Sequence, residues 1–424
     1  MTANIAAEIR ETLRQFFSVN SSVNHWYVGF SGGLDSSILL SVASELLPPD
    51  RLTALHINHG IQADAHDWQE HCRQFADRLN IQFKLHQVVC DGHSEASARD
   101  ARYDVFAQVV QEREGLLLAH HRNDQAETFL MRLMRGSGAI GLSGMPPSRP
   151  IGLGRLYRPL LDISHHQILA AANEIKLSWV DDPSNDQVHY TRNWIRHSLM
   201  PLLSERWPQV LQRLSDSASR MSESSELLAD LAAIDSDHVI LESQVSLDRL
   251  LTLSVPRRKN ILYFWLRNQG VPIPHHSRLE SMATAPIDSS GEWQFGAFKV
   301  RAFDGSLFLT KAHIGEASAP LECALREGSV LFSGGRLLIE SSDVGFEQGL
   351  CVHVRTRQPG DRVLIKQRGG HVTIKKFMNE QRVPYWLRDC WPVVTLGSTV
   401  IAIPGLWSHP DYLTQGGLSL NWRV

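Results

Sequence analysis

The first 135 residues alternate between strand-like and helix-like segments, and this alternation restricts the fold more than any other feature of the chain. Short apolar runs are each followed by a longer segment in which apolar residues recur with helical spacing. Such alternation is typical of parallel strands joined by helical crossovers. We therefore expect an α/β domain with a doubly wound parallel sheet, whose ligand site lies beyond the carboxyl ends of the strands. The expected strands are 25–30, 52–58, 82–89 and 115–120, and the expected helices are 35–47, 64–80, 94–114 and 123–135.

The alternation ends near residue 190, where helical patterns take over. Helical spacing continues to residue 233, and two or three further helices and several short strands are expected between 245 and 310. Beyond residue 321, glycine, valine and arginine become more frequent, which favours a small β-rich domain. We expect an N-terminal catalytic domain at 1–215, a helical or mixed middle domain at 216–320 and a β-rich C-terminal domain at 321–424.

The composition is that of an ordinary globular protein and excludes several classes. Forty-two basic and 45 acidic residues give a formal net charge of -3, so the chain is not a uniformly basic nucleic-acid binder. Its five cysteines lack short paired spacing, which argues against a zinc ribbon and fits a reducing compartment. The most membrane-like stretch, 392–407, is shorter than the ~18–20 residues that a span needs. We therefore expect a cytoplasmic protein with no membrane partner.

The strongest local motif follows an expected strand, opens an expected helix and reads Ser31-Gly32-Gly33-Leu34-Asp35-Ser36-Ser37. Its two glycines let the backbone approach an anion closely, and successive N–H groups at a helix start favour phosphate. Asp35 is unusual beside a phosphate unless a cation is present, so it suggests Mg²⁺. The motif lacks the lysine of a P-loop, which excludes that class of nucleotide binder. A serine or aspartate that merely caps the helix is the simpler alternative.

A second group of polar residues lies where the strand expected at 115–120 ends. His120 and His121 end this strand, and Asp124 and Glu127 lie three residues apart in the following helix, so the two carboxylates share one face. First-turn carboxylates also occur simply because they complement the helix dipole, and the histidines fit ordinary core or surface positions as well. The same helix has an apolar stripe that we expect to be buried, formed by Ala126, Phe129, Leu130, Leu133 and Met134.

Both motifs resemble those of known families. The loop at 31–37 resembles that of the PP-loop ATP pyrophosphatase superfamily, which has an adenine nucleotide α-hydrolase-like fold. Residues 119–128, which read AHHRNDQAET, resemble the signature of bacterial tRNA(Ile)-lysidine synthetases, and 135–145 continue the similarity. Similar segments follow in the same order at Glu95–Arg99, Arg102-Tyr103, Arg158–Leu161, Asp182–Asn185, Arg192-Asn193, Gly360–Arg362, Lys375–Phe377, Val383-Pro384 and Arg388-Asp389. One departure is HINHGIQ at 56–62, where the family often has charged residues, so we assign no charge-dependent role there.

The resemblance implies a cytoplasmic ligase that uses ATP and Mg²⁺ to attach free L-lysine to a tRNA. ATP would adenylate the 2-carbonyl oxygen of the wobble cytidine in the CAU-anticodon tRNA(Ile), with release of PPi. The ε-amine of lysine would then attack that carbon and AMP would leave. The product, lysidine, pairs with A rather than G, so codon reading would change from AUG to AUA. A monomer and a homodimer both remain open.

The resemblance also implies roles for individual residues. ATP is expected at Ser31, Gly32, Gly33, Leu34, Asp35, Ser36 and Ser37, with Mg²⁺ held by Asp35 and the phosphates. Asp124 and Glu127 are expected to bind the two ammonium groups of lysine, with His120 nearby. Arg192 would face the adenylate or the anticodon loop. The attacking amine must be neutral although its pKa in water is about 10.4, so either a carboxylate or His120 would take its proton. The expected catalytic residues are Asp35, His120, Asp124, Glu127 and Arg192.

The C-terminal region carries a local excess of positive charge. Between Cys351 and Cys390, nine basic residues accompany only three acidic ones. Such a segment is either a solvated surface or a contact for RNA phosphates, and the implied tRNA substrate favours the contact. Tyr385, Trp386 and Trp391 offer stacking surfaces, and 257–259 would add a second basic patch. The expected RNA-binding residues are Arg99, Arg102, Arg355, Arg357, Arg362, Lys375, Lys376 and Arg388. For Arg99 and Arg102, ATP is an alternative ligand to RNA phosphate, and a surface salt bridge is the simpler explanation.

Other functions fit the sequence less well. Asparagine synthetase needs an N-terminal cysteine, whereas this chain begins Met1-Thr2, and the glutaminase nucleophile of GMP synthetase is absent from the sequence. A PP-loop tRNA 2-thiolase is the main alternative, but it needs reactive cysteines, and none lies near the two motifs in the sequence. A non-catalytic protein that uses ATP to gate RNA binding is less consistent with the intact Asp35, Asp124 and Glu127.

Overall fold

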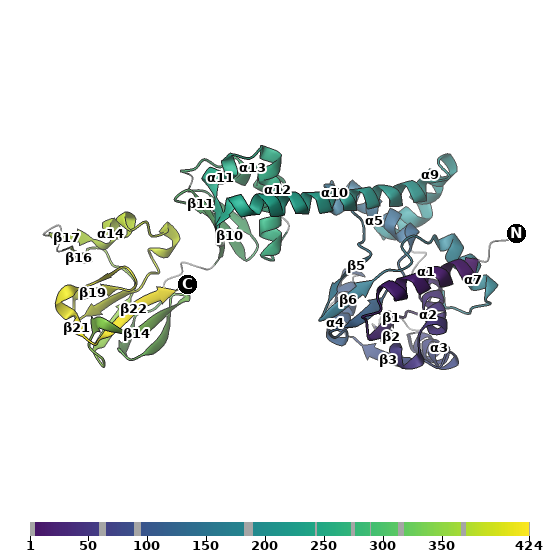
Figure 1. Cartoon of the computed structure of the whole chain (residues 1–424), viewed down its shortest axis with the longest axis horizontal. Coiled ribbons are helices and arrows are strands. Elements are labelled where there is room, and N and C mark those ends of the chain that lie inside the picture. Colours follow the sequence, from purple (N-terminus) through teal and green to yellow (C-terminus); the bar gives the residue numbers. More distant parts are fainter. Residues whose placement is uncertain are drawn as a thin grey trace. The chain divides into compact units, whose positions relative to one another are not determined.

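The computed structural model describes residues 5–58, 65–88, 95–181, 190–241, 244–272, 276–288, 290–312, 318–365 and 370–423. The chain divides into two compact units, 1–227 and 228–424, and each is considered by itself (Figure 1). None of the described helices is both long enough and apolar enough to cross a membrane. Of the segments named above, 59–62 and 182–185 lie outside the described residues.

The first unit is built on a six-stranded sheet. Its strands are β1 (His25–Gly29), β2 (Leu52–Asn58), β3 (Gln82–Gln87), β4 (Glu114–Leu117), β5 (Ser148–Ile151) and β6 (Gly154–Tyr157). The strand order is β3-β2-β1-β4-β6-β5, and all neighbours are parallel except β5 and β6. The expected doubly wound parallel sheet is therefore confirmed. The order reverses between β1 and β4, which is where open sheets of this kind bind ligands.

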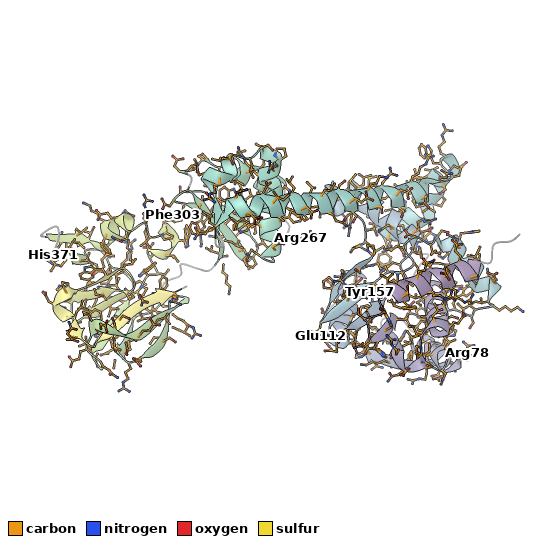
Figure 2. The ribbon with its side chains drawn as sticks, in the orientation of Figure 1. Arg78, Glu112, Tyr157, Arg267, Phe303 and His371 are labelled. Carbon is orange, nitrogen blue, oxygen red and sulfur yellow. The ribbon has the colours of Figure 1, made fainter. Side chains whose placement is uncertain are left out.

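The helices of this unit pack into several cores. They are α1 (Ile5–Val19), α2 (Leu34–Leu46), α3 (Ala65–Arg78), α4 (Glu95–Val109), α5 (Arg122–Met134), α6 (Ala139–Leu142), α7 (His165–Glu174), α8 (Thr191–Trp194) and α9 (Met200–Arg206). Residues of α1, α2, α3 and α7 share one core with Trp26, whose ring packs edge-on against Tyr157. Figure 2 labels Tyr157 in this unit. Phe106 of α4 belongs to a second core with Leu116 of β4.

One helix of the first unit is shorter than expected. The sequence predicts a helix from 94 to 114, whereas α4 ends at Val109. Arg113 adopts a left-handed φ of +60°, which no helix interior tolerates, and the chain enters β4 at the next residue. Helical spacing of apolar residues does not reveal this turn, because Val109 and Val110 are buried on either side of the helix end.

The prediction that the apolar stripe of α5 is buried is wrong at the C-terminal end of the helix. Leu133 and Met134 are 44% and 72% exposed rather than buried. The buried residues of α5 include Asp124, Gln125 and Glu127 together with its first apolar residues. This helix therefore buries polar side chains, which is unusual unless they are paired.

The second unit begins within a long helix and continues as a mixed region. The helix α10 (Val210–Val239) crosses the boundary between the two units. An antiparallel sheet follows with the order β7-β8-β11-β10-β9. Asp304 and Gly305, with φ of +46° and +73°, form the expected two-residue turn of its hairpin. The elements are β7 (Ile240–Leu241), β8 (Gln244–Ser246), α11 (Leu247–Leu251), α12 (Val255–Asn268), α13 (His276–Ala283), β9 (Glu292–Phe295), β10 (Phe298–Phe303) and β11 (Ser306–Lys311).

The rest of the second unit is rich in strands, as expected. One sheet has the order β12-β15-β18-β19-β20, a second joins β13, β21 and β22 to β14, and β16 pairs with β17. The only described α-helix here is α14 (Ile374–Glu380). The strands are β12 (Leu321–Ala324), β13 (Gly328–Phe332), β14 (Gly335–Phe346), β15 (Cys351–Arg355), β16 (Arg362–Ile365), β17 (Gly370–Thr373), β18 (Val393–Leu396), β19 (Thr399–Ile403), β20 (Trp407–Ser408), β21 (Thr414–Gln415) and β22 (Leu418–Arg423).

Candidate active site

The loop between β1 and α2 has the geometry of a phosphate-binding turn. Gly32 has a left-handed φ of +83°, and Gly33 is the N-cap of α2 without a side-chain cap. Ser31 Oγ and Ser36 Oγ lie 3.0 Å apart, and Ser37 Oγ donates to the carbonyl of Gly32. Because no side chain of a described residue caps α2, its first N–H groups can meet an anion. The simpler alternative, a serine or aspartate that caps the helix, does not apply.

Asp35 lies in the first turn of α2 with one oxygen unpaired. Its Oδ1 atom is buried and has no hydrogen-bond partner among the described residues. Its Oδ2 atom lies 3.6 Å from Nε2 of His121. A buried carboxylate oxygen is costly unless it meets a donor or a cation. Since Mg²⁺ is commonly held by one or two carboxylates together with substrate phosphates, the residues present fit such an ion.

A cysteine lies beside this loop in space, although none is near it in the sequence. A Cβ atom at Gly32 would come within 2.7 Å of Cys72 Sγ, which is on α3. Cys72 is fully buried, and this burial raises the pKa of its thiol to about 12. A thiol of this kind is not a thiolate near neutral pH, so Cys72 serves packing rather than sulfur chemistry.

His121 connects the loop to the polar residues of α5. It is the N-cap of α5: its Nδ1 accepts from the backbone N–H of Asp124, and the carboxylate of Asp124 accepts from the N–H of His121. Its Nε2 lies 3.6 Å from a carboxylate oxygen of both Asp35 and Asp124. Burial would lower the pKa of His121, but Asp124 and Asp35 outweigh burial and raise it.

Two arginines hold the carboxylates of α5. Arg192 donates to Glu127 Oε2 and Asp124 Oδ1, both at 2.8 Å. Arg196 donates to Glu127 Oε1 at 2.7 Å and to Asp124 Oδ1 at 3.0 Å. Glu127 and Asp124 are only 1% and 7% exposed. Burial would raise the pKa of Asp124, but the positive charges around it, first that of His121, keep it below its ordinary value. The carboxylates expected to bind lysine therefore already have cationic partners.

His120 lies beside this group in a different environment. Its Nδ1 accepts a hydrogen bond of 3.1 Å from Nε of Arg158. Burial lowers the pKa of His120 to about 3, against the opposing charge of Asp124. The ring is therefore neutral near pH 7 and a weak base. The pKa of Asp124 is lowered too, so pKa does not favour one of the two kinds of proton acceptor considered above.

Three residues of this cluster were not among the expected catalytic residues. His121 was named beside His120, but only the structure reveals that it approaches both Asp35 and Asp124. Arg196 follows Arg192 by four residues, so helical spacing would have placed them on one face. Arg158 lies in a segment that resembles the family, yet nothing in the sequence indicates its contact with His120.

Several expected RNA-binding residues are engaged within the protein. Arg355 forms a two-bond ion pair with Asp361 at 2.7 and 2.8 Å, Arg357 pairs with Asp389, and Arg388 donates to the carbonyl of Val383 at 2.7 Å. The most open side chains of the set are Arg99, Arg362, Lys375 and Lys376, which are exposed. The set as a whole stays a prediction.

The second basic patch and two of the aromatic residues have structural roles. Arg257 pairs with Asp235, Lys259 pairs with Glu280, and Arg258 donates to three backbone carbonyls. Trp386 is 9% exposed beneath the guanidinium of Arg301, and Trp391 packs against Trp422. Trp386 therefore lacks the open stacking surface that the sequence suggested, whereas an RNA contact of the second basic patch stays a prediction.

Sequence comparisons agree with this architecture. A family model described as a PP-loop domain matches residues 1–203. A model described as the TilS substrate binding domain matches 246–308, and one described as the TilS substrate C-terminal domain matches 352–422. The parallel sheet, the loop after β1 and these matches define a PP-loop protein of the class that uses ATP.

Curated relatives narrow the class to one family. A tRNA(Ile)-lysidine synthase of Coxiella burnetii is 36% identical over 430 residues, which cover 98% of this chain and 96% of that protein. The Pseudomonas aeruginosa protein of the same name is 34% identical over 440 residues, which cover 98% of this chain and 97% of that protein. The chain therefore belongs to the tRNA(Ile)-lysidine synthase family. The thiolase alternative is not favoured by these relatives.

Proposed function

We propose that this chain is a cytoplasmic enzyme that ligates free L-lysine to the wobble cytidine of the CAU-anticodon tRNA(Ile). In the first step the 2-carbonyl oxygen of the base attacks the α-phosphorus of ATP, and the bond to pyrophosphate breaks. In the second step the ε-nitrogen of lysine attacks C2, the bond from C2 to the adenylate oxygen breaks, and AMP leaves. The amine gives up its proton as the new C–N bond forms.

The observation that carries this proposal is the meeting of the two polar groups at the reversal point of the sheet. His121 Nε2 lies 3.6 Å from carboxylate oxygens of Asp35, which belongs to the phosphate loop, and Asp124, which belongs to α5. An ATP on the loop would therefore lie next to the Asp124–Glu127 pair. Adenylation takes place at the 2-carbonyl oxygen, and the amine attacks the carbon bonded to it, so this proximity is what the chemistry needs.

We infer that Asp124 and Glu127 bind the lysine substrate through a rearrangement of Arg192 and Arg196. Each carboxylate now accepts hydrogen bonds from both arginines. A lysine ammonium group can replace one guanidinium without leaving a carboxylate unpaired, which would be costly at this burial. The released arginine would then carry a positive charge toward the adenylate phosphate. The proton of the amine would go to a carboxylate of this pair or to His120; the lowered pKa values of Asp124 and His120 make each of these two a weak base.

We infer that Mg²⁺ accompanies ATP at Asp35. The unpartnered Oδ1 atom supports this assignment. The ion would neutralise charge on the pyrophosphate leaving group. The backbone N–H groups at the start of α2, with Ser31, Ser36 and Ser37, would hold the phosphates themselves.

We further propose that the tRNA is bound in part by regions remote from the chemistry. The second unit holds the two regions matched by the TilS models, and a limit near residue 320 would separate a middle from a C-terminal domain. Arg362, Lys375 and Lys376 are exposed and are the candidates for phosphate contacts there.

The two steps are tested separately with ATP labelled in its α-phosphate. A tRNA transcript with the CAU anticodon is incubated with the protein, Mg²⁺ and labelled ATP in the absence of lysine. We expect acid-precipitable label on the RNA, and its release as AMP when lysine is added. A transcript in which the wobble cytidine is replaced by uridine is the control. Label that reaches the RNA equally well with this control would contradict the proposal.

A further inference from the structure

A second polar cluster lies on the other side of His120 and is not used by the mechanism above. Its centre is Tyr103 of α4. The guanidinium carbon of Arg99 lies 5.1 Å from the centre of the Tyr103 ring, and that of Arg149, from β5, lies 4.7 Å from it. Each contact is within the range of a cation–π interaction. Two positive charges from separate elements therefore converge on one aromatic ring.

A third guanidinium completes the cluster. Arg158 follows β6, is 5% exposed and donates to Nδ1 of His120 at 3.1 Å and to the carbonyl of Pro146 at 2.7 Å. Burial lowers the pKa of Arg158, and the charges of Arg149 and Arg99 act in the same direction. These four residues are called the Tyr103 cluster: Tyr103, Arg99, Arg149 and Arg158.

The cluster has positive charge without a matching negative charge. Within the described ranges, no carboxylate forms an ion pair with Arg99, Arg149 or Arg158, whereas Arg192 and Arg196 have two carboxylates each. The hydroxyl of Tyr103 is buried, and the guanidinium groups of Arg149 and Arg158 act on its oxygen without a well-formed hydrogen bond. Since guanidinium groups only donate, the O–H hydrogen has no acceptor among the same residues. A buried guanidinium without an anion is costly, and so is a buried hydroxyl without an acceptor.

We propose that the Tyr103 cluster binds a phosphate group. A phosphate would satisfy the hydroxyl hydrogen and the convergent guanidinium groups at once, because its oxygens accept several hydrogen bonds and guanidinium matches their geometry. Burial would raise the pKa of Tyr103, but Arg99 and the two other arginines outweigh it and lower the pKa, which makes the hydroxyl a stronger donor.

The position of the cluster limits the source of this phosphate to two molecules. Arg158 touches His120, and His120 is in turn close enough to Asp124 and Arg192 to feel their charges. The phosphate would therefore lie beside the reacting groups. It belongs either to the RNA backbone next to the target nucleotide or to ATP. This choice rests on the function proposed above, whereas the presence of a phosphate site does not.

The test compares Arg149→Gln with Arg155→Gln, which removes the same charge from β6, the strand paired with β5. Arg155 is exposed and donates to Ser148, away from the cluster. Binding of tRNA and of ATP–Mg²⁺ is measured separately for the full-length protein and both variants, without lysine. Thermal unfolding confirms that each variant is folded. Tyr103→Phe, which keeps the ring and removes only the hydroxyl, is measured in the same way.

If the phosphate is that of the RNA, Arg149→Gln weakens tRNA binding about tenfold and lowers the slope of log K against log salt by about 0.7–0.9. ATP binding then stays at the level of Arg155→Gln. If the phosphate is that of ATP, Arg149→Gln weakens ATP binding, and tRNA binding stays at the level of Arg155→Gln. Either result supports the site. Tyr103→Phe should weaken binding of the same ligand by a smaller factor.

The proposal is overturned if folded Arg149→Gln binds both ligands as well as Arg155→Gln does. Because the readout is binding without turnover, it stays decisive even if lysine ligation proves wrong. Conversely, the wild-type protein could form lysidine while Arg149→Gln binds both ligands normally. This result would contradict the phosphate site and leave the proposed function intact.

Discussion

At the scale of single residues, the buried carboxylate pair of α5 is the feature on which substrate choice depends. Glu127→Gln keeps the shape of the side chain and removes its charge. We expect the KM for lysine to rise about tenfold to a hundredfold, since a hydrogen bond to a charged group contributes about 1.5–3 kcal/mol. Adenylation of the tRNA without lysine should change much less. Initial rates at varied lysine concentration provide the measurement.

The matched control for this prediction is Glu45→Gln. Glu45 pairs with Arg10 on the surface, with 41% of its side chain exposed, so its loss removes the same charge without touching the site. If Glu127→Gln had the same lysine KM as Glu45→Gln, the assignment of Glu127 to lysine binding would be wrong.

The low pKa of His120 leads to a separate prediction about how the free energy of unfolding depends on pH. Its folded-state pKa of about 3 lies below the value of about 6.5 in an unfolded chain. Between these values the unfolded chain binds a proton that the folded protein does not, so the free energy of unfolding falls as the pH falls below 6.5. His120→Gln should flatten this dependence by up to one proton, or about 1.4 kcal/mol per pH unit.

Denaturant unfolding of both proteins at several pH values between 4.5 and 7 measures this slope. A variant whose slope equals that of the wild type would contradict a buried, neutral His120. A histidine that acts as the general base near pH 7 would also produce an acid limb in the rate profile that is lost in His120→Gln. We expect no such limb from His120.

At the scale of elements, the start of α5 combines a structural and a chemical role in His121. Asparagine is a good N-cap, whereas alanine costs about 1 kcal/mol of stability at such a position. His121→Asn should therefore unfold at nearly the wild-type temperature, and His121→Ala about 2–4 °C lower. Both should lose adenylation activity to a similar extent, because neither reaches Asp35 as the imidazole does.

Thermal melts and RNA adenylation rates of the two variants separate these roles. Recovery of activity in His121→Asn together with stability would mean that His121 acts only as a cap.

The elements also indicate where reasoning from the sequence succeeds. The strands and helices that carry the loop at 31–37 and the residues 120–127 were predictable, because strand–helix alternation and helix starts are local patterns. The end of α4 was not, because it depends on a left-handed Arg113 that apolar spacing does not encode. The stripe on α5 failed at Leu133 and Met134 because polar residues take up the buried face at its other end.

Contacts between distant segments were harder to predict. The resemblance brought Asp124, Glu127 and Arg192 to one site, and the four-residue spacing from Arg192 could have added Arg196. The contact of Arg158 with His120 depends on tertiary structure alone. The same holds for Arg355 and Arg357: their positive charge is visible in the sequence, whereas their internal partners, Asp361 and Asp389, are not recognisable as such without the fold.

At the scale of the whole molecule, tRNA affinity should depend on exposed charge in the second unit. Lys375 and Lys376 lie exposed at the start of α14. The double variant Lys375→Ala/Lys376→Ala should weaken tRNA binding and lower the salt slope by about 0.7–0.9 for each phosphate that the protein no longer neutralises. Lysine and ATP binding should be unaffected.

Filter binding at several salt concentrations measures the slope. Arg267→Ala, which removes one charge from α12 of the same unit, measures the effect of losing a single charge elsewhere (Figure 2). A double variant with the salt slope of the wild type would exclude these lysines from the RNA contact.

The most direct test of the whole account is the transfer of labelled lysine to tRNA. The protein is incubated with labelled lysine, ATP–Mg²⁺ and unfractionated bacterial tRNA, and the RNA is then treated with mild alkali, which hydrolyses aminoacyl esters but not a lysine bonded to a base. We predict label that survives alkali, requires ATP and is lost in Asp35→Asn. If tRNA binding and ATP use were intact but no stable label appeared, lysine ligation would be contradicted.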